Sequence, residues 1–94
     1  MIELFQAEWC PYSALVRQRL TELGVDYVIR QAAPEPHERD AMREATGSDT
    51  IPTLVLEDGT VVGGDTGEII AVLEERFAPA PWEEGHRRQA ALHE

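Results

Sequence analysis

The sequence predicts a single α/β domain built on a mixed four-stranded sheet, and three observations lead to this fold class. A short apolar strand, a helix of about a dozen residues and a second strand open the chain, the pattern of a parallel βαβ unit. An Asp-Gly turn later joins two short β-rich runs and predicts a hairpin. The clearest amphipathic helix follows that hairpin. The expected element order is therefore β-α-β-α-β-β-α.

The first half of the chain contains the βαβ unit. Residues 2–5 are apolar and predict a strand that ends at a polar stop. Residues 11–23 predict a helix, because Pro11 suits a first helical position and Gly24 suits the left-handed residue after a last turn. Residues 25–30 are rich in aliphatic and aromatic side chains and predict a second strand, parallel to the first.

The second half predicts a weak helix, the hairpin and a strong helix. Residues 35–46 have weak helical patterning, with acidic side chains near the start. Residues 53–56 and 60–62 are the two hairpin strands. Asp65 or Thr66 can cap the last helix. Its apolar residues recur at helical spacing: Ile69, Ile70, Leu73 and Phe77.

The composition excludes several function classes. The 94 residues hold 8 Lys and Arg against 18 Asp and Glu, a formal charge of −10, which repels nucleic-acid backbones and anionic membranes. No signal peptide is visible, and no apolar stretch approaches the roughly 20 residues of a membrane span. The single cysteine allows no internal disulfide or cysteine-cluster metal site, and it fits a reducing compartment. We expect a cytoplasmic, monomeric protein that binds no nucleic acid, membrane or metal.

The single cysteine lies where the first strand turns into the first helix. Because Cys10 precedes Pro11, its thiol is expected beside free backbone N–H groups and the positive end of the helix dipole. Both favour the thiolate over the thiol. The alternative is a small apolar residue packed at a strand–helix junction, since free cysteines are often simply buried. The local pattern favours the reactive thiol.

Three motifs together carry a family resemblance. Cys10-Pro11-Tyr12-Ser13 ends the first strand, Thr50-Ile51-Pro52-Thr53 precedes the third, and Gly63-Gly64-Asp65-Thr66 starts the last helix. With these motifs in this element order, residues 1 to about 77 resemble a glutaredoxin. The N-terminal domain of glutathione transferases shares this thioredoxin-like fold. The resemblance implies a glutaredoxin-like domain over residues 1–78.

Residues 79–94 follow that domain as a Pro-rich linker and a polar C-terminal tail. The tail has some helical propensity. Trp82 can pack back onto the domain, or the tail can fray, and the sequence does not decide between the two.

The resemblance implies a glutathione-dependent monothiol thiol–disulfide oxidoreductase. Cys10 stands at the position of the family nucleophile, whose thiolate attacks the glutathione sulfur of a mixed disulfide. Ser13 stands where dithiol members have a second cysteine, so an internal disulfide is foreclosed. Its hydroxyl can donate to the thiolate, or it can simply satisfy the helix N-terminus. Glutathione, or another low-molecular-weight thiol, is the implied co-substrate, and glutathionylated proteins are the implied partners.

The resemblance also implies a glutathione site. Pro52 corresponds to the family's cis-proline, beside which the backbone of Ile51 pairs with the cysteine of glutathione. The glycine turn and the helix start hold the γ-glutamyl end. Arg39 stands near a position where members often carry a side chain that reaches the glycine carboxylate; the alternative is a solvated helix charge. The implied glutathione-binding residues are Tyr12, Arg39, Thr50, Ile51, Pro52, Gly64, Asp65 and Thr66.

One departure from the family pattern lies beside the cysteine. Many glutaredoxins have a lysine where this chain has Ala7, and the acidic Glu8 follows. Loss of that cation should raise the pKa of the thiol and weaken the binding of an anionic thiol. The activity, or the preferred low-molecular-weight thiol, is therefore open.

Two other functions stay open. An iron–sulfur cluster carrier would bridge two chains through one cysteine each and two glutathiones, although Pro11 and Tyr12 differ from the Gly-Phe usual in such relatives. The other is a glutathione-transferase-like or non-catalytic thioredoxin-fold binding module, for which Ala7 is the motivation.

Overall fold

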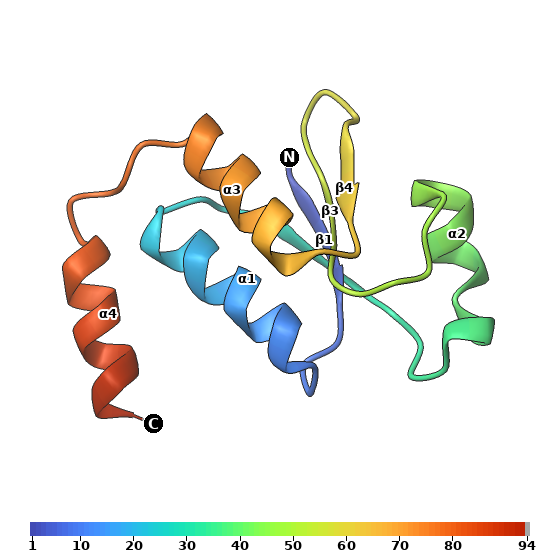
Figure 1. Ribbon diagram of the computed structural model, residues 1–94, viewed down its shortest axis with the longest axis horizontal. Helices are drawn as coiled ribbons and strands as arrows, with labels where there is room; N and C mark the ends of the chain where they lie inside the picture. The colour runs from blue at the N-terminus through green and yellow to red at the C-terminus, as the bar shows by residue number, and fades with distance from the viewer. Residues whose placement is uncertain (94) are drawn as a thin grey trace.

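The computed structural model describes residues 1–93 and contains one four-stranded sheet with helices packed around it (Figure 1). The strands, in chain order, are β1 (Glu3–Gln6), β2 (Val28–Gln31), β3 (Thr53–Val55) and β4 (Val61–Gly63). Their order in the sheet is β2-β1-β3-β4. β1 is parallel to β2 and antiparallel to β3, and β4 is antiparallel to β3. This mixed sheet confirms the predicted α/β, thioredoxin-like fold class.

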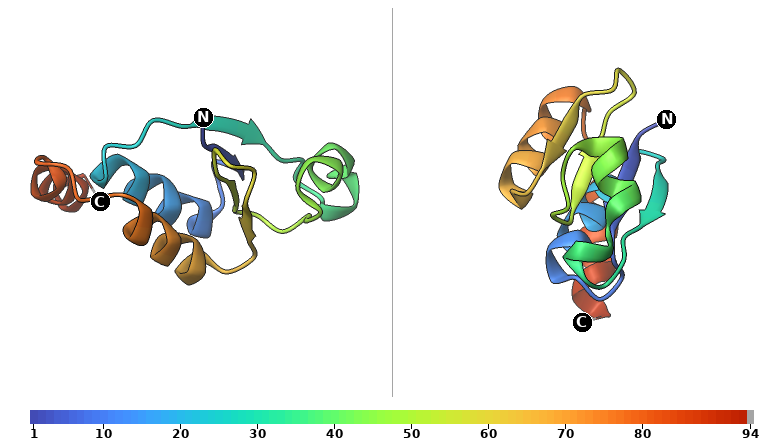
Figure 2. Two further views of the ribbon diagram at one scale, coloured as in Figure 1. Left: turned by 90° about the horizontal axis from the view of Figure 1, so that it is seen from above. Right: turned by 90° about the vertical axis from the view of Figure 1, so that its right-hand side faces the viewer.

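The helices divide between one face of the sheet and the two ends of the molecule. They are α1 (Pro11–Glu22), the short 3₁₀ turn η1 (Pro36–Glu38), α2 (Asp40–Thr46), α3 (Thr66–Arg76) and α4 (Glu83–Leu92). α1 and α3 pack together on the same face of the sheet, whereas α2 and α4 lie at opposite ends of the long axis (Figures 1 and 2). The N-terminal ends of α1 and α3 therefore lie side by side, at the edge of the sheet where β1 ends.

The core lies between the sheet and the pair α1 and α3. In β1, Leu4 and Gln6 are fully buried, while Glu3 and Phe5 on the opposite face are half-buried. This alternation is the period-2 pattern of a strand with one face toward the core. Most of the buried apolar side chains form one continuous cluster: Ile2, Leu4, Val16, Leu20, Leu23, Leu54, Leu56, Ile69 and Leu73.

Two predicted elements have different bounds in the structure. β2 begins at Val28 instead of residue 25, because the N–H of Val25 donates to the Leu20 carbonyl (3.0 Å) and closes the end of α1. The predicted helix over residues 35–46 is divided into η1 and α2 at Arg39. The backbone of Arg39 leaves helical geometry there, and its side chain turns inward to loop carbonyls.

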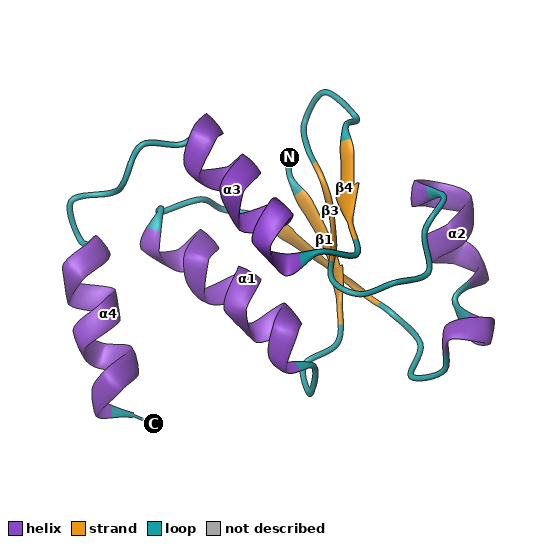
Figure 3. Ribbon diagram, in the orientation of Figure 1, coloured by secondary structure: helices purple, strands orange, loops and turns teal. Residues whose placement is uncertain are grey.

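The C-terminal tail packs back onto the domain as α4, across a loop from α3 (Figure 3). The Trp82 ring lies against Gly24, where an added Cβ would come within 3.0 Å of it. Gly24 also has φ +68°, a conformation that favours glycine. Among residues 1–93, no helix combines the length and apolar character needed to cross a bilayer.

An ion-pair network fastens α4 to α1 and α3. Arg19 contacts Glu22 (2.8 Å), Glu83 (2.6 Å) and Glu74 (3.5 Å). Arg87 contacts the same Glu22 (3.3 Å) and Glu83 (2.8 Å). Because Arg19, Glu22 and Glu83 are each less than a fifth exposed, solvent screens their ion pairs less than it screens surface pairs.

Candidate thiol site and its groove

Cys10 is the N-terminal cap of α1. Its sulfur accepts a hydrogen bond from the N–H of Ser13 (3.4 Å), and Pro11 occupies the first helical position. The turn before it closes by a bond from the Cys10 N–H to the Ala7 carbonyl (3.1 Å). The side chain is 6 % exposed. The sulfur therefore occupies the place that Ser, Thr or Asp oxygens usually take at a helix start.

The surroundings of Cys10 favour its thiolate. Burial raises the pKa of the thiol, since it disfavours the charged form. Hydrogen bonds from the Ser13 side chain and backbone act in the opposite direction, as do the Tyr12 N–H and the charge of Arg17. The net pKa of Cys10 lies below its ordinary value. A thiolate is the nucleophilic form of cysteine, so this environment suits thiol chemistry.

Ser13 faces the sulfur from the first turn of α1. Its side chain is fully buried, and among residues 1–93 its hydroxyl has no hydrogen-bond partner with good geometry. A thiolate at Cys10 supplies the acceptor that this hydroxyl otherwise lacks, and the resulting bond lowers the pKa of the thiol.

A groove of about 400 Å³ lies between the N-terminal ends of α1 and α3. That volume falls within the roughly 300–1,000 Å³ of small-molecule pockets. Six of the eight residues predicted to bind glutathione line it, together with Gly67, which the sequence did not single out. The lining residues are Tyr12, Thr50, Ile51, Gly64, Asp65, Thr66 and Gly67. Gly67 is the second residue of α3, and it belongs to none of the three motifs in the sequence.

Pro52 is buried behind this groove, and the Ile51–Pro52 peptide bond is cis. The loop before it is fastened by the Thr53 hydroxyl, which donates to the Thr50 carbonyl (2.6 Å). Gly63 packs against that hydroxyl so closely that an added Cβ would lie 2.6 Å from the Thr53 Oγ1. The β3–β4 pairing thus places the Thr50–Pro52 segment against the start of α3.

The start of α3 forms the other wall of the groove. The Asp65 carboxylate caps the helix by accepting from the Glu68 N–H (3.2 Å), as one of the two predicted caps. Gly64 has φ +85°, which turns the chain from β4 into that cap. Helix N-termini carry free N–H groups and a partial positive charge, so this wall suits a carboxylate.

Arg39 lies outside the groove. Its side chain is buried, and its three nitrogens donate to the carbonyls of Ala33 (2.7 Å), Asp49 (2.8 Å) and Pro34 (3.0 Å). These bonds join the loop after β2 to the loop before β3. A contact between Arg39 and a ligand carboxylate requires them to break first.

Arg17 is the residue near the thiol that the sequence reasoning missed. Its guanidinium donates to the buried amide of Gln6 and lies 3.4 Å from the Glu8 carboxylate. Its charge lowers the pKa of Cys10. The cation absent at Ala7 is thus partly replaced from α1. Its spacing is a usable signal, because seven residues are two helical turns and keep Arg17 on the same face as Cys10.

Residues 4–81 match the model of the family described as "Glutathione S-transferase, N-terminal domain". The chain belongs to this family. An uncharacterized glutaredoxin-like 8.6 kDa protein from Clostridium pasteurianum is 24% identical over 74 residues, which are 79% of this chain and 99% of that protein. The chain thus belongs to the glutathione S-transferase N-terminal domain family and is also similar to a small glutaredoxin-like protein.

Solved structures give the same fold for this family member. Glutathione S-transferase 1-6 from Anopheles dirus is 27% identical, with a TM-score of 0.70 over 81% of this chain. A glutathione transferase homologue from Sulfitobacter, solved with bound glutathione, is 19% identical, with a TM-score of 0.65 over 77%. The chain spans only 36% and 35% of these two proteins.

Proposed function

We propose that the protein is a monothiol thiol–disulfide oxidoreductase that uses glutathione, or a related low-molecular-weight thiol. One observation carries the proposal: a cysteine with a lowered pKa caps α1 beside a groove that the cis-Pro52 loop and the start of α3 complete. A buried structural cysteine needs neither the groove nor the helix-start hydrogen bonds. The Sulfitobacter homologue's bound glutathione supports glutathione as the thiol.

The reaction proceeds in two exchange steps. The Cys10 thiolate attacks the glutathione sulfur of a protein mixed disulfide, forms a Cys10–glutathione disulfide and releases the protein thiolate, which takes up a proton. The thiolate of a second glutathione then attacks the sulfur of the bound glutathione. This step releases oxidised glutathione and restores the Cys10 thiolate. Overall, one free glutathione thiol is consumed: its sulfur becomes half of the oxidised glutathione, the protein thiol is restored, and no second cysteine is needed.

The groove residues have distinct roles in this proposal. The backbone of Ile51, which lines the groove, pairs with the peptide backbone of glutathione. The start of α3 holds the γ-glutamyl carboxylate, and the Asp65 carboxylate faces the γ-glutamyl ammonium. Ser13 stabilises the Cys10 thiolate while it attacks and while it leaves.

An adduct measurement tests the proposal. Reduced protein is incubated with oxidised glutathione at neutral pH and its intact mass is measured, alongside Cys10→Ser. We expect one glutathione adduct on the unchanged chain, none on the variant, and reversal by reduced glutathione. The absence of an adduct, under conditions where a known glutaredoxin reacts, would contradict the proposal.

A further inference from the structure

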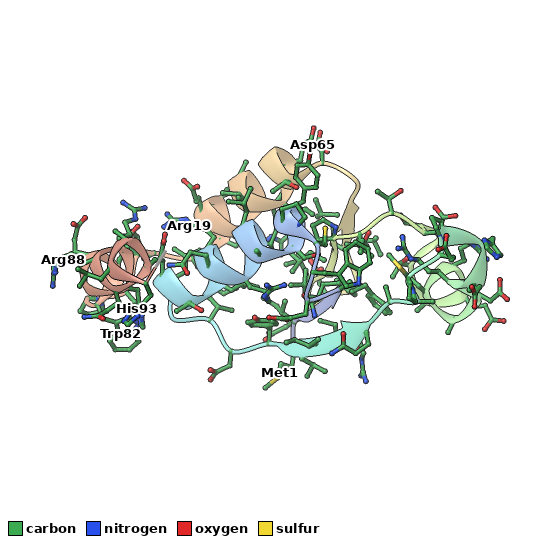
Figure 4. All side chains as sticks on the ribbon, turned by 90° about the horizontal axis from the view of Figure 1, so that it is seen from below. Met1, Arg19, Asp65, Trp82, Arg88 and His93 are labelled. Carbon is green, nitrogen blue, oxygen red and sulfur yellow. The ribbon has the colours of Figure 1, made fainter. Side chains whose placement is uncertain are left out.

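Every basic side chain of this protein other than histidine is an arginine, and nearly all of them are already engaged. The chain has 8 arginines and no lysine. Within residues 1–93, seven arginines bind protein groups: Arg17, Arg19, Arg30, Arg39, Arg43, Arg76 and Arg87. Arg88 is exposed on α4, at one end of the molecule and away from Asp65 (Figure 4).

Among residues 1–93, no basic side chain lines the groove. Asp65 is the only charged lining residue in this part of the chain, and its carboxylate faces solvent as well as the helix start. Glu8, two residues before Cys10, is 77 % exposed in its side chain and pairs with Arg17. Arg17 is thereby partly neutralised on the side toward solvent. The approach to the sulfur is uncharged or acidic, within a chain of formal charge −10.

Glutathione carries an α-amino acid at one end and a glycine carboxylate at the other. The α-amino-acid end finds the N–H groups of α3 and the Asp65 carboxylate. No lining residue of the groove within residues 1–93 carries a positive charge to pair with the glycine carboxylate, and the net negative charge of the protein repels it. Hydrogen bonds from backbone groups remain available to it, but they are exposed to water, and such bonds contribute little net binding.

We propose that the groove recognises a thiol through its α-amino-acid end and gains nothing from a carboxylate at the other end. The preferred substrates are disulfides of γ-glutamyl thiols whose distal end is uncharged or cationic. This inference rests on the proposed reaction at Cys10. In this proposal, the choice of thiol is determined by the absence of a basic residue from the groove and not by a particular contact.

A pair of matched disulfides tests the inference. The reduced protein is mixed at low ionic strength with oxidised glutathione, or with oxidised glutathione esterified at both glycine carboxylates. Adduct formation at Cys10 is followed by intact mass. The rate with 2-mercaptoethanol corrects for the intrinsic reactivity of each disulfide. We expect the ester to react faster, by up to about tenfold, and added salt should reduce this advantage.

The outcomes separate the two proposals. Adducts from both disulfides, with oxidised glutathione at least as fast as the ester after correction, overturn the charge argument and leave the oxidoreductase intact. No adduct from either disulfide overturns both. A preference for the ester that persists at high salt overturns the electrostatic cause, because screening should remove it.

A gain-of-charge variant supplies the positive control. Thr50 is exposed and lines the groove, so Thr50→Lys adds an ammonium to a groove that otherwise lacks a basic lining residue within residues 1–93. We expect this variant to shift the preference toward oxidised glutathione by at least about threefold. Thr60→Lys adds the same charge in the exposed β3–β4 turn, away from the groove, and should shift it less. Equal shifts of the disulfide preference in both variants would mean that the net charge of the protein, and not a charge in the groove, determines the preference. That result would overturn the proposal.

Discussion

At the scale of single residues, the reactivity of Cys10 depends on a few donors that replace its lost hydration. Burial alone would raise the pKa of this thiol, and it falls only because hydrogen bonds from Ser13 and the charge of Arg17 outweigh burial. A lowered thiol pKa means that the nucleophilic form is present at lower pH. Alkylation should therefore rise through the pKa of Cys10 and level off above it.

Ser13→Ala removes the largest contribution that favours the thiolate. We expect the rise of iodoacetamide reactivity to move to higher pH, with alkylation near pH 6 about tenfold slower, the scale of one hydrogen bond to a charged group. Rates measured by intact mass across pH check this. Thr21→Ala, at an exposed position of the same helix, serves as control and should keep the original profile. If the pH dependence of alkylation is unchanged in Ser13→Ala, the Ser13 hydroxyl contributes only to packing and does not stabilise the thiolate.

Arg17→Gln should move the same profile in the same direction, but less. Its guanidinium is partly exposed and shared with Glu8, so the effect on the alkylation rate should be about two- to fivefold, as for solvent-screened charge pairs. Glu8→Gln frees the same guanidinium and should move the profile to lower pH. Arg30→Gln, on β2, is the control. If the alkylation profiles of Arg17→Gln and Glu8→Gln shift in the same direction along the pH axis, this account is contradicted.

Gly63 contributes to stability because it has no side chain that would clash with Thr53. An added Cβ would lie 2.6 Å from the Thr53 Oγ1, so Gly63→Ala must displace the hydroxyl that fastens the Thr50 carbonyl. We expect the free energy of unfolding to fall by about 1–3 kcal/mol, the usual range for an overpacked site. Urea titration measures it. Gly85→Ala, inside α4, should instead raise it by up to about 1 kcal/mol, because alanine favours a helix.

At the scale of elements, the sequence predicted those parts that local signals determine. The α3 helix and its Asp65 cap, the end of α1 at Gly24 and the hairpin turn all follow from neighbouring residues. The start of β2 and the inward turn of Arg39 depend on distant partners, so periodicity could not locate them. The charge of Arg17 near the thiol agrees with its helical spacing from Cys10, whereas its hydrogen bond to the buried Gln6 amide involves a distant partner that no local pattern indicated.

The α1–α4 junction predicts a pH-dependent stability. Burial raises the pKa of Glu22, but hydrogen bonds from Gln18, Arg19 and Arg87 outweigh it, so the net pKa lies below the ordinary value. A lowered carboxyl pKa contributes stability above the unfolded pKa, and this stability is lost as the pH falls through the folded pKa. The docking of α4 should therefore weaken in acid and stay constant around neutrality.

Glu22→Gln tests this junction at neutral pH. We expect a loss of about 1–2 kcal/mol in unfolding free energy, because the variant leaves two arginines with fewer acceptors. The difference from the unchanged chain should shrink at acidic pH, where Glu22 is itself protonated. Glu75→Gln, exposed on α3, should have little effect at any pH. A difference that does not depend on pH would indicate lost packing instead of lost charge.

At the scale of the whole molecule, the thiol site and the α4 junction lie at opposite ends of α1. We propose that residues 1–78 form the functional unit and that α4 supports it from a distance. A chain ending at residue 78 should still form the glutathione adduct at Cys10, while its unfolding free energy falls by about 1 kcal/mol through loss of the Arg19–Glu83 ion pair. Loss of the adduct in a variant that remains folded would contradict the separation.

The two tryptophans occupy these same two ends. Trp9 is 65% exposed and directly precedes Cys10, whereas Trp82 lies against Gly24 at the α4 junction. Indole emission responds to nearby chemistry and to water. Trp82→Phe therefore leaves a fluorescent reporter of events at the sulfur, and Trp9→Phe leaves a reporter of α4 docking. The protein can thus be followed optically at each end, without an attached dye.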